Sequence, residues 1–258
     1  MTDTIQIDPK TRFGEAWERL FEPAVAHRGL WSPSGAPENS LAAFQAACSH
    51  GYGIELDVQL SADGEAVVFH DYTLGRMTGA EGRLSDRSVA DLGKLRLAGT
   101  DETIPTLADV LTLVGHRAMV HIELKTPAGE VGPLEQRVHE IIIDHSGPLA
   151  VIGFNPYSHA WFAQHFPNVL RGLDSYGYND DGARKLAPEL RQSYADLEHI
   201  SIARPHFLAL GVDMLPSPKA ARLRANGMPV VAWTVRSAEQ WASLAPHCDN
   251  LIFEGFAA

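Results

Sequence analysis

Histidine, arginine and carboxylate residues stand at the ends of apolar, β-prone runs in this sequence. These residues are His27, Arg28, Glu55, Asp57, His70 and Asp71. A strand of a parallel sheet is apolar because both of its faces are covered. Polar residues at the C-terminal end of such a strand are unexpected unless they serve a function. In α/β sheets and barrels, ligands bind at that end. The sequence therefore predicts a ligand site at the strand ends.

A metal site is the first chemistry that the spacing indicates. Glu55 and Asp57 are two residues apart on one expected strand, so both side chains point to the same face. Two carboxylates forced close together repel each other, and burial adds to the cost. A divalent cation would remove this penalty, and oxygen-only ligands favour a hard ion, Mg²⁺ or Ca²⁺. The alternative is two solvated carboxylates at a strand end.

The run 121–125 has the same property, because His121, Glu123 and Lys125 share one face of an expected strand. Glu123 is the candidate third carboxylate of the metal site, and Lys125 places a cation beside it. The alternative is an internal ion pair between Glu123 and Lys125. We expect His121 to be a packed or supporting residue rather than a metal ligand.

His27 and His70 suit general acid–base catalysis, because the unperturbed pKa of histidine lies near neutrality. The alternative is that each is an ordinary core histidine. Arg28 offers a planar fork suited to a phosphate, and Lys125 offers a point charge for the same group. A base, an acid, a hard metal and two cations form a constellation for phosphoryl transfer. Asp71 is a candidate partner of His70, although adjacency in sequence does not establish the contact.

The composition limits the class of protein. The chain has 258 residues, 45% of them hydrophobic, and a formal net charge of −11, which argues against a general nucleic-acid binder. No apolar run approaches the roughly 20 residues of a membrane span. Residues 1–22 are mixed and charged, unlike a signal peptide. Two cysteines, Cys48 and Cys248, are too few for a disulfide framework, so we expect free thiols and a cytoplasmic location.

Strand-like and helix-like segments alternate along the chain. About eight candidate parallel strands predict an α/β fold, a single-domain (β/α)₈ TIM barrel, with an open doubly wound sheet as the alternative. One strand, 66–69, follows its predecessor through the hairpin signal Asp63-Gly64. Weak strands are expected at 200–202 and 212–215. Residues 1–23, with an amphipathic stretch at 13–20, are expected to form a helical cap, and residues 24–258 the barrel.

Read together, these residues resemble the glycerophosphodiester phosphodiesterase family in its compact bacterial form. The matching segments are AHRG at 26–29, APENSLAAF at 36–44, GIELDVQLSADGEAVVFHD at 53–71, TIPTLADVL at 103–111, HIELK at 121–125 and VVAWTVRS at 230–237. The resemblance implies a (β/α)₈ barrel with one divalent cation. It also implies hydrolysis of small glycerophosphodiesters to sn-glycerol 3-phosphate and an alcohol, an activity of lipid and glycerol metabolism.

The resemblance also implies a role for particular residues. It makes His27 and His70 the acid–base pair, with His27 favoured as base, and water or the glycerol 2-hydroxyl as the attacking group. The remaining assignments are metal ligation by Glu55, Asp57 and Glu123, and substrate binding by Arg28, Lys125, Glu38 and Trp233.

Two positions depart from the family pattern, and several others stay unassigned. Arg236 stands where the family often has asparagine, and residues 252–256, Ile-Phe-Glu-Gly-Phe, stand where the family often ends its last strand with Thr-Asp before a proline. Both are expected on the catalytic rim, where the alcohol would be selected. Four polar residues near other strand ends have no assignment: Asn155, Tyr157, Tyr176 and Tyr178.

Two other functions are compatible with the pattern. One is a phospholipase D-like enzyme acting on lysophospholipid or sphingolipid head groups, which would need a hydrophobic acyl channel. The other is a barrel that binds phosphodiesters without turning them over, which the complete set of histidines, carboxylates and lysine argues against. The sequence gives no assembly state.

Overall fold

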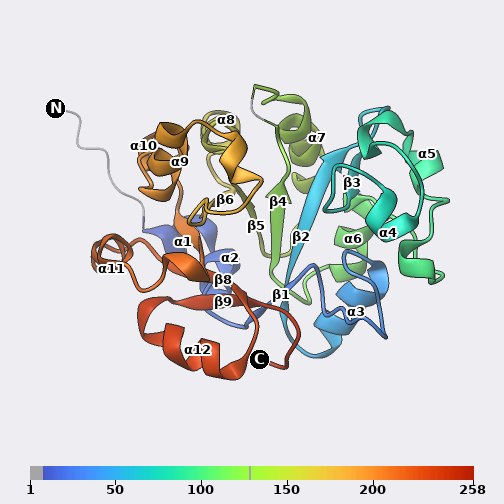
Figure 1. Cartoon of the computed structure of the whole chain (residues 1–258). Helices are drawn as coiled ribbons and strands as arrows, with labels where there is room; N and C mark the ends of the chain where they lie inside the picture. The colour runs from blue at the N-terminus through green and yellow to red at the C-terminus, as the bar shows by residue number, and fades with distance from the viewer. Residues whose placement is uncertain (1–7, 128) are drawn as a thin grey trace.

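A ring of parallel strands, surrounded by helices, organises the computed structural model, which describes residues 8–127 and 129–258. Within these residues, eight parallel strands pair in the order β1-β9-β8-β7-β6-β5-β4-β2, and β1 pairs with β2 to close the barrel (Figure 1). The strands are β1 Val25–His27, β2 Gly53–Leu60, β4 Val120–Leu124, β5 Leu149–Gly153, β6 Leu170–Ser175, β7 Phe207–Gly211, β8 Val230–Val235 and β9 Asn250–Phe253. The predicted TIM barrel is confirmed.

The remaining strand, β3 Ala66–Val68, runs antiparallel beside β2, as the turn signal predicted. The chain then leaves the barrel and returns only at α6. This excursion contains α4 Gly75–Thr78 and α5 Val89–Leu92 and has a small apolar core of its own. It brings His70 and Asp71 to the C-terminal ends of the barrel strands, so a short detour of the chain positions one of the predicted catalytic residues.

Helices cover the outside of the ring, and capping residues in the sequence mark where several of them begin. The outer helices are α3 Leu41–Ser49, α6 Leu107–Val114, α7 Pro133–Ile142, α8 Pro156–His165, α9 Pro188–Ala195, α10 Ile200–Ala203, α11 Pro218–Ala225 and α12 Ala238–Leu244. Ser40 caps α3 by accepting a hydrogen bond from Ala43 N, and Thr106 caps α6 in the same way. Each such cap contributes about 1 kcal/mol. No helix within the described residues is long and apolar enough to cross a bilayer.

The expected strands at 200–202 and 212–215 were wrong. Residues 200–203 form α10, which packs on α8, and 212–214 form a 3₁₀ turn that follows β7. The β-branched Ile200 and Ile202 favour a strand locally, but the surrounding packing decides, because strand preference depends strongly on context. The true strand, β7, is the apolar run just before the expected one.

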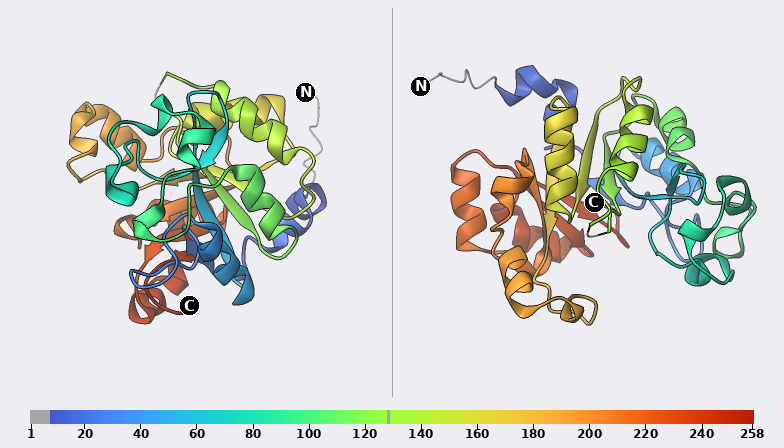
Figure 2. Two further views of the ribbon diagram at one scale, coloured as in Figure 1. Left: turned by 90° about the vertical axis from the view of Figure 1, so that its right-hand side faces the viewer. Right: turned by 90° about the horizontal axis from the view of Figure 1, so that it is seen from above.

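The N-terminal helices, α1 Pro9–Phe13 and α2 Glu15–Glu18, lie at the end of the barrel opposite the site (Figure 2). Leu20 is fully buried against residues that fill the barrel interior, among them Val25, Met119 and Phe207. Asn250 Nδ2 donates to the carbonyl oxygens of Leu20 and Pro23, at 3.0 Å each. We propose that this segment is the cap expected for 1–23, of which residues 1–7 lie outside the described part.

If the cap closes the barrel, Leu20→Ala should destabilise the whole domain. Removing a fully buried leucine side chain costs about 2–5 kcal/mol of unfolding free energy. Urea denaturation of the variant measures this. Leu190→Ala on α9 is the control, because Leu190 is 37% exposed and its loss should cost no more than about 1 kcal/mol. Equal stability of Leu20→Ala and the wild type would contradict the cap.

Candidate active site

Strand register brings the three predicted metal carboxylates together. Asp57 in β2 lies directly across the ladder from Glu123 in β4, and Glu55 lies across from His27 in β1. All three carboxylates are buried, and one oxygen from each lies within 4.8 Å of the others. Within the described residues, the predicted set of Glu55, Asp57 and Glu123 is the group whose geometry fits a bound cation.

The electrostatics of this cluster also fit a cation. Burial raises the pKa of Glu55 well above its usual range, and the charges of Asp57 and Glu123 add to the effect. Burial likewise raises the pKa of Glu123 to about 7. A divalent cation would remove the mutual repulsion that opposes ionisation of these groups. The oxygen-only donor set suits Mg²⁺ or Ca²⁺.

Arg28 and Lys125 lie beside the carboxylates. Lys125 Nζ is 3.0 Å from Asp57 Oδ1 and 3.0 Å from Glu123 Oε1, and Arg28 Nε is 3.4 Å from Asp57 Oδ2. Glu123 and Lys125 therefore form the expected ion pair and also take part in the cluster, so the two interpretations of that strand are compatible.

The turn after β1 is built around Arg28 and Gly29. Arg28 has φ 59°, and its backbone N–H donates to Glu55 Oε2 at 3.0 Å. Gly29 has φ 80°, and a Cβ atom there would lie 2.9 Å from Ala43 in α3. Both the positive φ and the close approach of α3 require glycine. The His27-Arg28-Gly29 motif thus reflects a backbone constraint as well as chemistry.

Asn39 supports the carboxylate cluster, a role the sequence did not reveal. Its side chain Nδ2 donates to Asp57 Oδ2 at 2.8 Å, and Asn39 is buried. Asn39 directly precedes Ser40, which is the N-cap of α3, and Asn39 does not itself cap the helix. Asn39 instead orients Asp57, since its amide lies where a hydrogen bond to the carboxylate is available.

Each predicted catalytic histidine is held by a carboxylate through Nδ1. His27 Nδ1 lies 2.7 Å from Glu254 Oε2, and Glu254 Oε1 lies 2.7 Å from Arg236 Nη2. The hydrogen bond with His27 lowers the pKa of Glu254 to about 2 even though burial opposes this. Both departures from the family pattern, Arg236 and Glu254, therefore belong to one chain of contacts that ends on His27.

His70 has the same arrangement. Its Nδ1 lies 2.7 Å from Asp71 Oδ1, so the candidate pairing is present, and Arg76 Nε lies 2.6 Å from Asp71 Oδ2. Gln59 Nε2 fixes this loop by donating to the carbonyl oxygen of Asp71 at 2.9 Å. With Nδ1 engaged, Nε2 is the nitrogen of each ring that can exchange protons with a ligand, and Nε2 of His27 also lies 3.9 Å from Glu55 Oε2.

Glu38 joins the two halves of this network. Its Oε1 accepts from Arg28 Nη1 at 2.9 Å and from Arg76 Nη2 at 2.7 Å. Burial alone would raise the pKa of Glu38, but the bonds from Arg76 and Arg28 lower it. Glu38 lies behind Arg28 rather than on the wall of the pocket.

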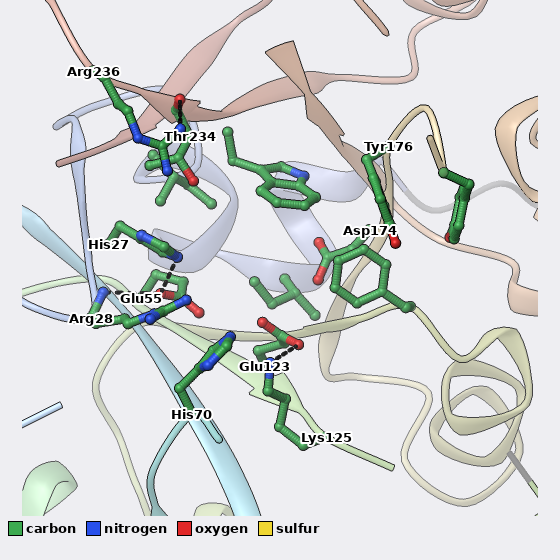
Figure 3. A pocket seen from close by; sticks show the side chains of 15 residues that line it. His27, Arg28, Glu55, His70, Glu123, Lys125, Asp174, Tyr176, Thr234 and Arg236 are labelled. Carbon is green, nitrogen blue, oxygen red and sulfur yellow. Dashed lines mark hydrogen bonds and ion pairs between the residues drawn. The ribbon is translucent and has the colours of Figure 1, made fainter. Parts of the chain in front are cut away.

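These side chains surround a pocket of about 440 Å³ at the C-terminal ends of the strands (Figure 3). Seven of the nine predicted site residues line it: His27, Arg28, Glu55, His70, Glu123, Lys125 and Trp233. Asp57 and Glu38 are buried behind this wall. His121 is fully buried against Phe207, with ring centroids 5.7 Å apart, and burial lowers its pKa to about 4, as a packed residue requires.

The sequence did not single out the opposite wall as a unit. Phe154, Asp174, Tyr176, Tyr178 and Trp233 line it, and only the tyrosines and Trp233 were noted. Figure 3 shows Asp174 and Tyr176 across the pocket from His27 and Arg28. Asp174 could have been found from the pattern of β6, because a carboxylate near the end of an apolar strand is the signal that identified Glu55. Asn155 instead caps α8, and Tyr157 is exposed.

Comparison with known proteins gives the family. A sequence model described as the glycerophosphoryl diester phosphodiesterase family matches residues 27–149. Glycerophosphodiester phosphodiesterase 1 of Mus musculus is 38% identical over 242 residues, covering 84% of this chain and 72% of the relative. A glycerophosphodiester phosphodiesterase of Caldanaerobacter subterraneus is 37% identical over 161 residues, covering 58% of this chain and 65% of the relative.

Solved structures of phosphodiesterases match this chain over most of its length. A phosphodiesterase of Oleispira antarctica, solved in complex with the product sn-glycerol-3-phosphate, matches with a TM-score of 0.78 and 25% identity. The match covers 93% of this chain and 94% of that one. A glycerophosphodiester phosphodiesterase of Thermotoga maritima matches with a TM-score of 0.69 and 26% identity, covering 90% of this chain and 94% of that one.

The fold and these matches define a TIM-barrel phosphodiesterase. The chain belongs to the glycerophosphoryl diester phosphodiesterase family, as its sequence resemblance indicated, and it is an enzyme of that class.

The contact between Glu254 and His27 generates a prediction. Glu254→Gln keeps the shape but removes the negative charge at Nδ1, so turnover should fall roughly tenfold to a hundredfold while the fold is retained. A steady-state assay on a glycerophosphodiester and a thermal melt measure the two effects. Asp144→Asn, on the exposed surface at the far end of the barrel, is the control and should change neither. Full activity in Glu254→Gln would show that His27 does not depend on this carboxylate.

Proposed function

We propose that this enzyme hydrolyses glycerophosphodiesters to sn-glycerol 3-phosphate and an alcohol, with a bound divalent cation and two histidines. The observation that carries the proposal is the pocket in which His27 and His70, each held at Nδ1 by a carboxylate, lie beside the buried carboxylate cluster. The product found in the Oleispira antarctica neighbour supports the same substrate class.

The cation is assigned to Glu55, Asp57 and Glu123, whose oxygens are close enough to share one ion. Mg²⁺ and Ca²⁺ both suit this donor set. When bound, such an ion supplies a Lewis acid that offsets negative charge on the phosphate oxygens.

Arg28 and Lys125 are assigned to the phosphodiester anion. Both line the pocket, and neither needs to move far from its carboxylate partners to reach a ligand there. Glu38, which holds Arg28 and Arg76, would keep the guanidinium of Arg28 in place. Trp233 is assigned to the wall of the substrate pocket.

In the reaction that we propose, His27 Nε2 removes the proton from the attacking hydroxyl, either water or the glycerol 2-hydroxyl. The ionised Glu254 at Nδ1 stabilises the imidazolium that forms. His70 then protonates the leaving alkoxide. If the 2-hydroxyl is the attacking group, the product of this step is a cyclic phosphate, which water opens to sn-glycerol 3-phosphate. Burial lowers the pKa of His70, and the charges of Lys125 and Arg28 contribute. An anionic phosphodiester bound at those two cations offsets their charge and favours protonation of His70 in the complex.

Replacing either histidine tests the acid–base roles. His27→Ala and His70→Ala should each lower kcat by about 10²–10⁴. A coupled assay for glycerol 3-phosphate release from glycerophosphocholine, glycerophosphoethanolamine and glycerophosphoglycerol measures this. His165→Ala, an exposed histidine of α8, is the matched control and should be fully active. Near wild-type turnover in both site variants would remove the assignment.

Chelation and a ligand variant test the cation. EDTA should abolish release, and adding back Mg²⁺ or Ca²⁺ should restore it and identify the preferred ion. Glu55→Gln removes one ligand charge, so a higher metal concentration should be needed for half-maximal activity, by about tenfold or more. Activity that survives exhaustive chelation would contradict metal dependence.

The same assays separate the alternatives. Turnover of lysophospholipids in place of the small diesters would favour the phospholipase D-like function, and affinity without turnover would favour a binding barrel. We also propose a cytoplasmic location, which the two free thiols, Cys48 and Cys248, support because a reducing compartment preserves them.

A further inference from the structure

Three aromatic rings form one corner of the pocket, on the side away from Arg28. Phe154 follows β5, Tyr176 follows β6 and Trp233 lies in β8. The centroids of Phe154 and Trp233 are 5.5 Å apart with the ring planes at 79°. Those of Phe154 and Tyr176 are 5.8 Å apart at 86°, and those of Tyr176 and Trp233 are 6.2 Å apart at 62°. Rings at such angles enclose a corner instead of stacking on one another.

The rings are held in place before any ligand binds. Trp233 Nε1 donates to Ala209 O at 2.9 Å, so the single polar group of the indole is already used and the ring itself remains for the ligand. Tyr178 packs on Tyr176 with centroids 4.1 Å apart, and Tyr194 stacks on Tyr178 at 5.6 Å. A preformed wall of this kind lowers the entropic cost of binding.

Asp174 of β6 places a carboxyl group in the same corner. Only 4% of the residue is exposed, and its Oδ1 is buried without a hydrogen-bond partner. Within residues 8–127 and 129–258, no lysine, arginine or histidine forms an ion pair with it. Figure 3 shows its carboxyl group beside Tyr176 and across the pocket from His27. A buried carboxyl without a partner is costly, so a native structure that keeps one calls for an explanation.

We propose that this corner binds an ammonium group carried by the alcohol of the phosphodiester. Asp174 supplies the counter-charge, and the faces of the three rings supply cation–π attraction. The inference deepens the proposed function and rests on it, because it names the class of alcohol that the enzyme releases. The pocket offers a partner for each charge of such a zwitterion: Arg28 and Lys125 are assigned to the phosphate, and Figure 3 shows Asp174 across the pocket from Arg28.

Two other roles for Asp174 fit less well. As a fourth metal ligand it would have to lie with the cluster of Glu55, Asp57 and Glu123, and its oxygens are not in that group. As a partner for a neutral polyol it could accept one or two hydroxyl bonds, but the faces of Phe154 and Trp233 offer further hydroxyls no strong partner, and Trp233 Nε1 is already used. An ammonium group uses both the carboxylate and the rings.

A charged substrate and its neutral isostere test the proposal. The 3,3-dimethylbutyl ester of glycerol 3-phosphate has the shape of glycerophosphocholine without its charge. The wild-type kcat/KM should be higher for the choline ester by about tenfold or more. In Asp174→Asn the ratio of kcat/KM for the choline ester to that for the neutral ester should fall toward one. Tyr176→Leu, at a partly exposed position, should also lower this ratio, because it removes one cation–π partner. Asp144→Asn should leave the ratio unchanged.

The outcomes separate this inference from the proposed function. Equal rates for the two esters in the wild type, or an equal loss on both in Asp174→Asn, would overturn the ammonium site while leaving the phosphodiesterase activity intact. Glycerophosphoethanolamine then distinguishes a primary from a quaternary ammonium group. If no ester is hydrolysed, the proposed function fails, and calorimetry with choline decides the site. Binding that weakens tenfold or more in Asp174→Asn supports the site, and no binding to the wild type contradicts it.

Discussion

Mutual repulsion among three buried carboxylates is the constraint on which the rest of this site depends. Glu55, Asp57 and Glu123 share the upper interior of a closed barrel, where neighbouring strands leave them no room to separate. Positively polarised groups of the surrounding residues lie against these carboxylates. Lys125 lies against two of the carboxylates, and a backbone N–H of the turn after β1 points at the third. The positive φ of Arg28 accompanies the inward direction of that N–H, and Gly29 lets α3 pack closely against the same turn.

The two histidines depend on parts of the chain that lie far apart in sequence. His27 leaves the first strand but is held by Glu254, which follows the last. His70 is held by Asp71, whose other oxygen meets Arg76 in the excursion between β3 and α6. Glu38 then ties Arg76 to Arg28. Barrel closure therefore fixes the orientation of His27 and the excursion fixes that of His70, so the two imidazoles are both in place only in the complete fold.

The sequence predicted the barrel and the reacting side of the site because both depend on local patterns. The apolar strands that carry His27, Asp57 and Glu123 are recognisable in the sequence because polar residues interrupt otherwise apolar, β-prone runs. The contacts of Glu254 and Asn39 could not be predicted, because each joins elements whose separation in space depends on strand register. The strand expected at 200–202 failed for a similar reason, since packing against α8 outweighs the preference of isoleucine.

The origin of the pocket walls along the chain has one further consequence. The carboxylate cluster, both histidines and the two cations proposed to bind the phosphate come from residues 27–125, whereas Phe154, Asp174, Tyr176 and Trp233 come from 154–233. The groups proposed to carry the reaction and those proposed to bind the alcohol thus occupy successive stretches of one gene. Recombination near β5 could exchange the proposed alcohol-binding residues without the proposed catalytic residues. The descendant enzyme would then accept different esters and keep the same reaction. Glu254 and its partner Arg236 come from beyond residue 233, and a hybrid enzyme would have to inherit an acidic residue at position 254 to keep His27 oriented.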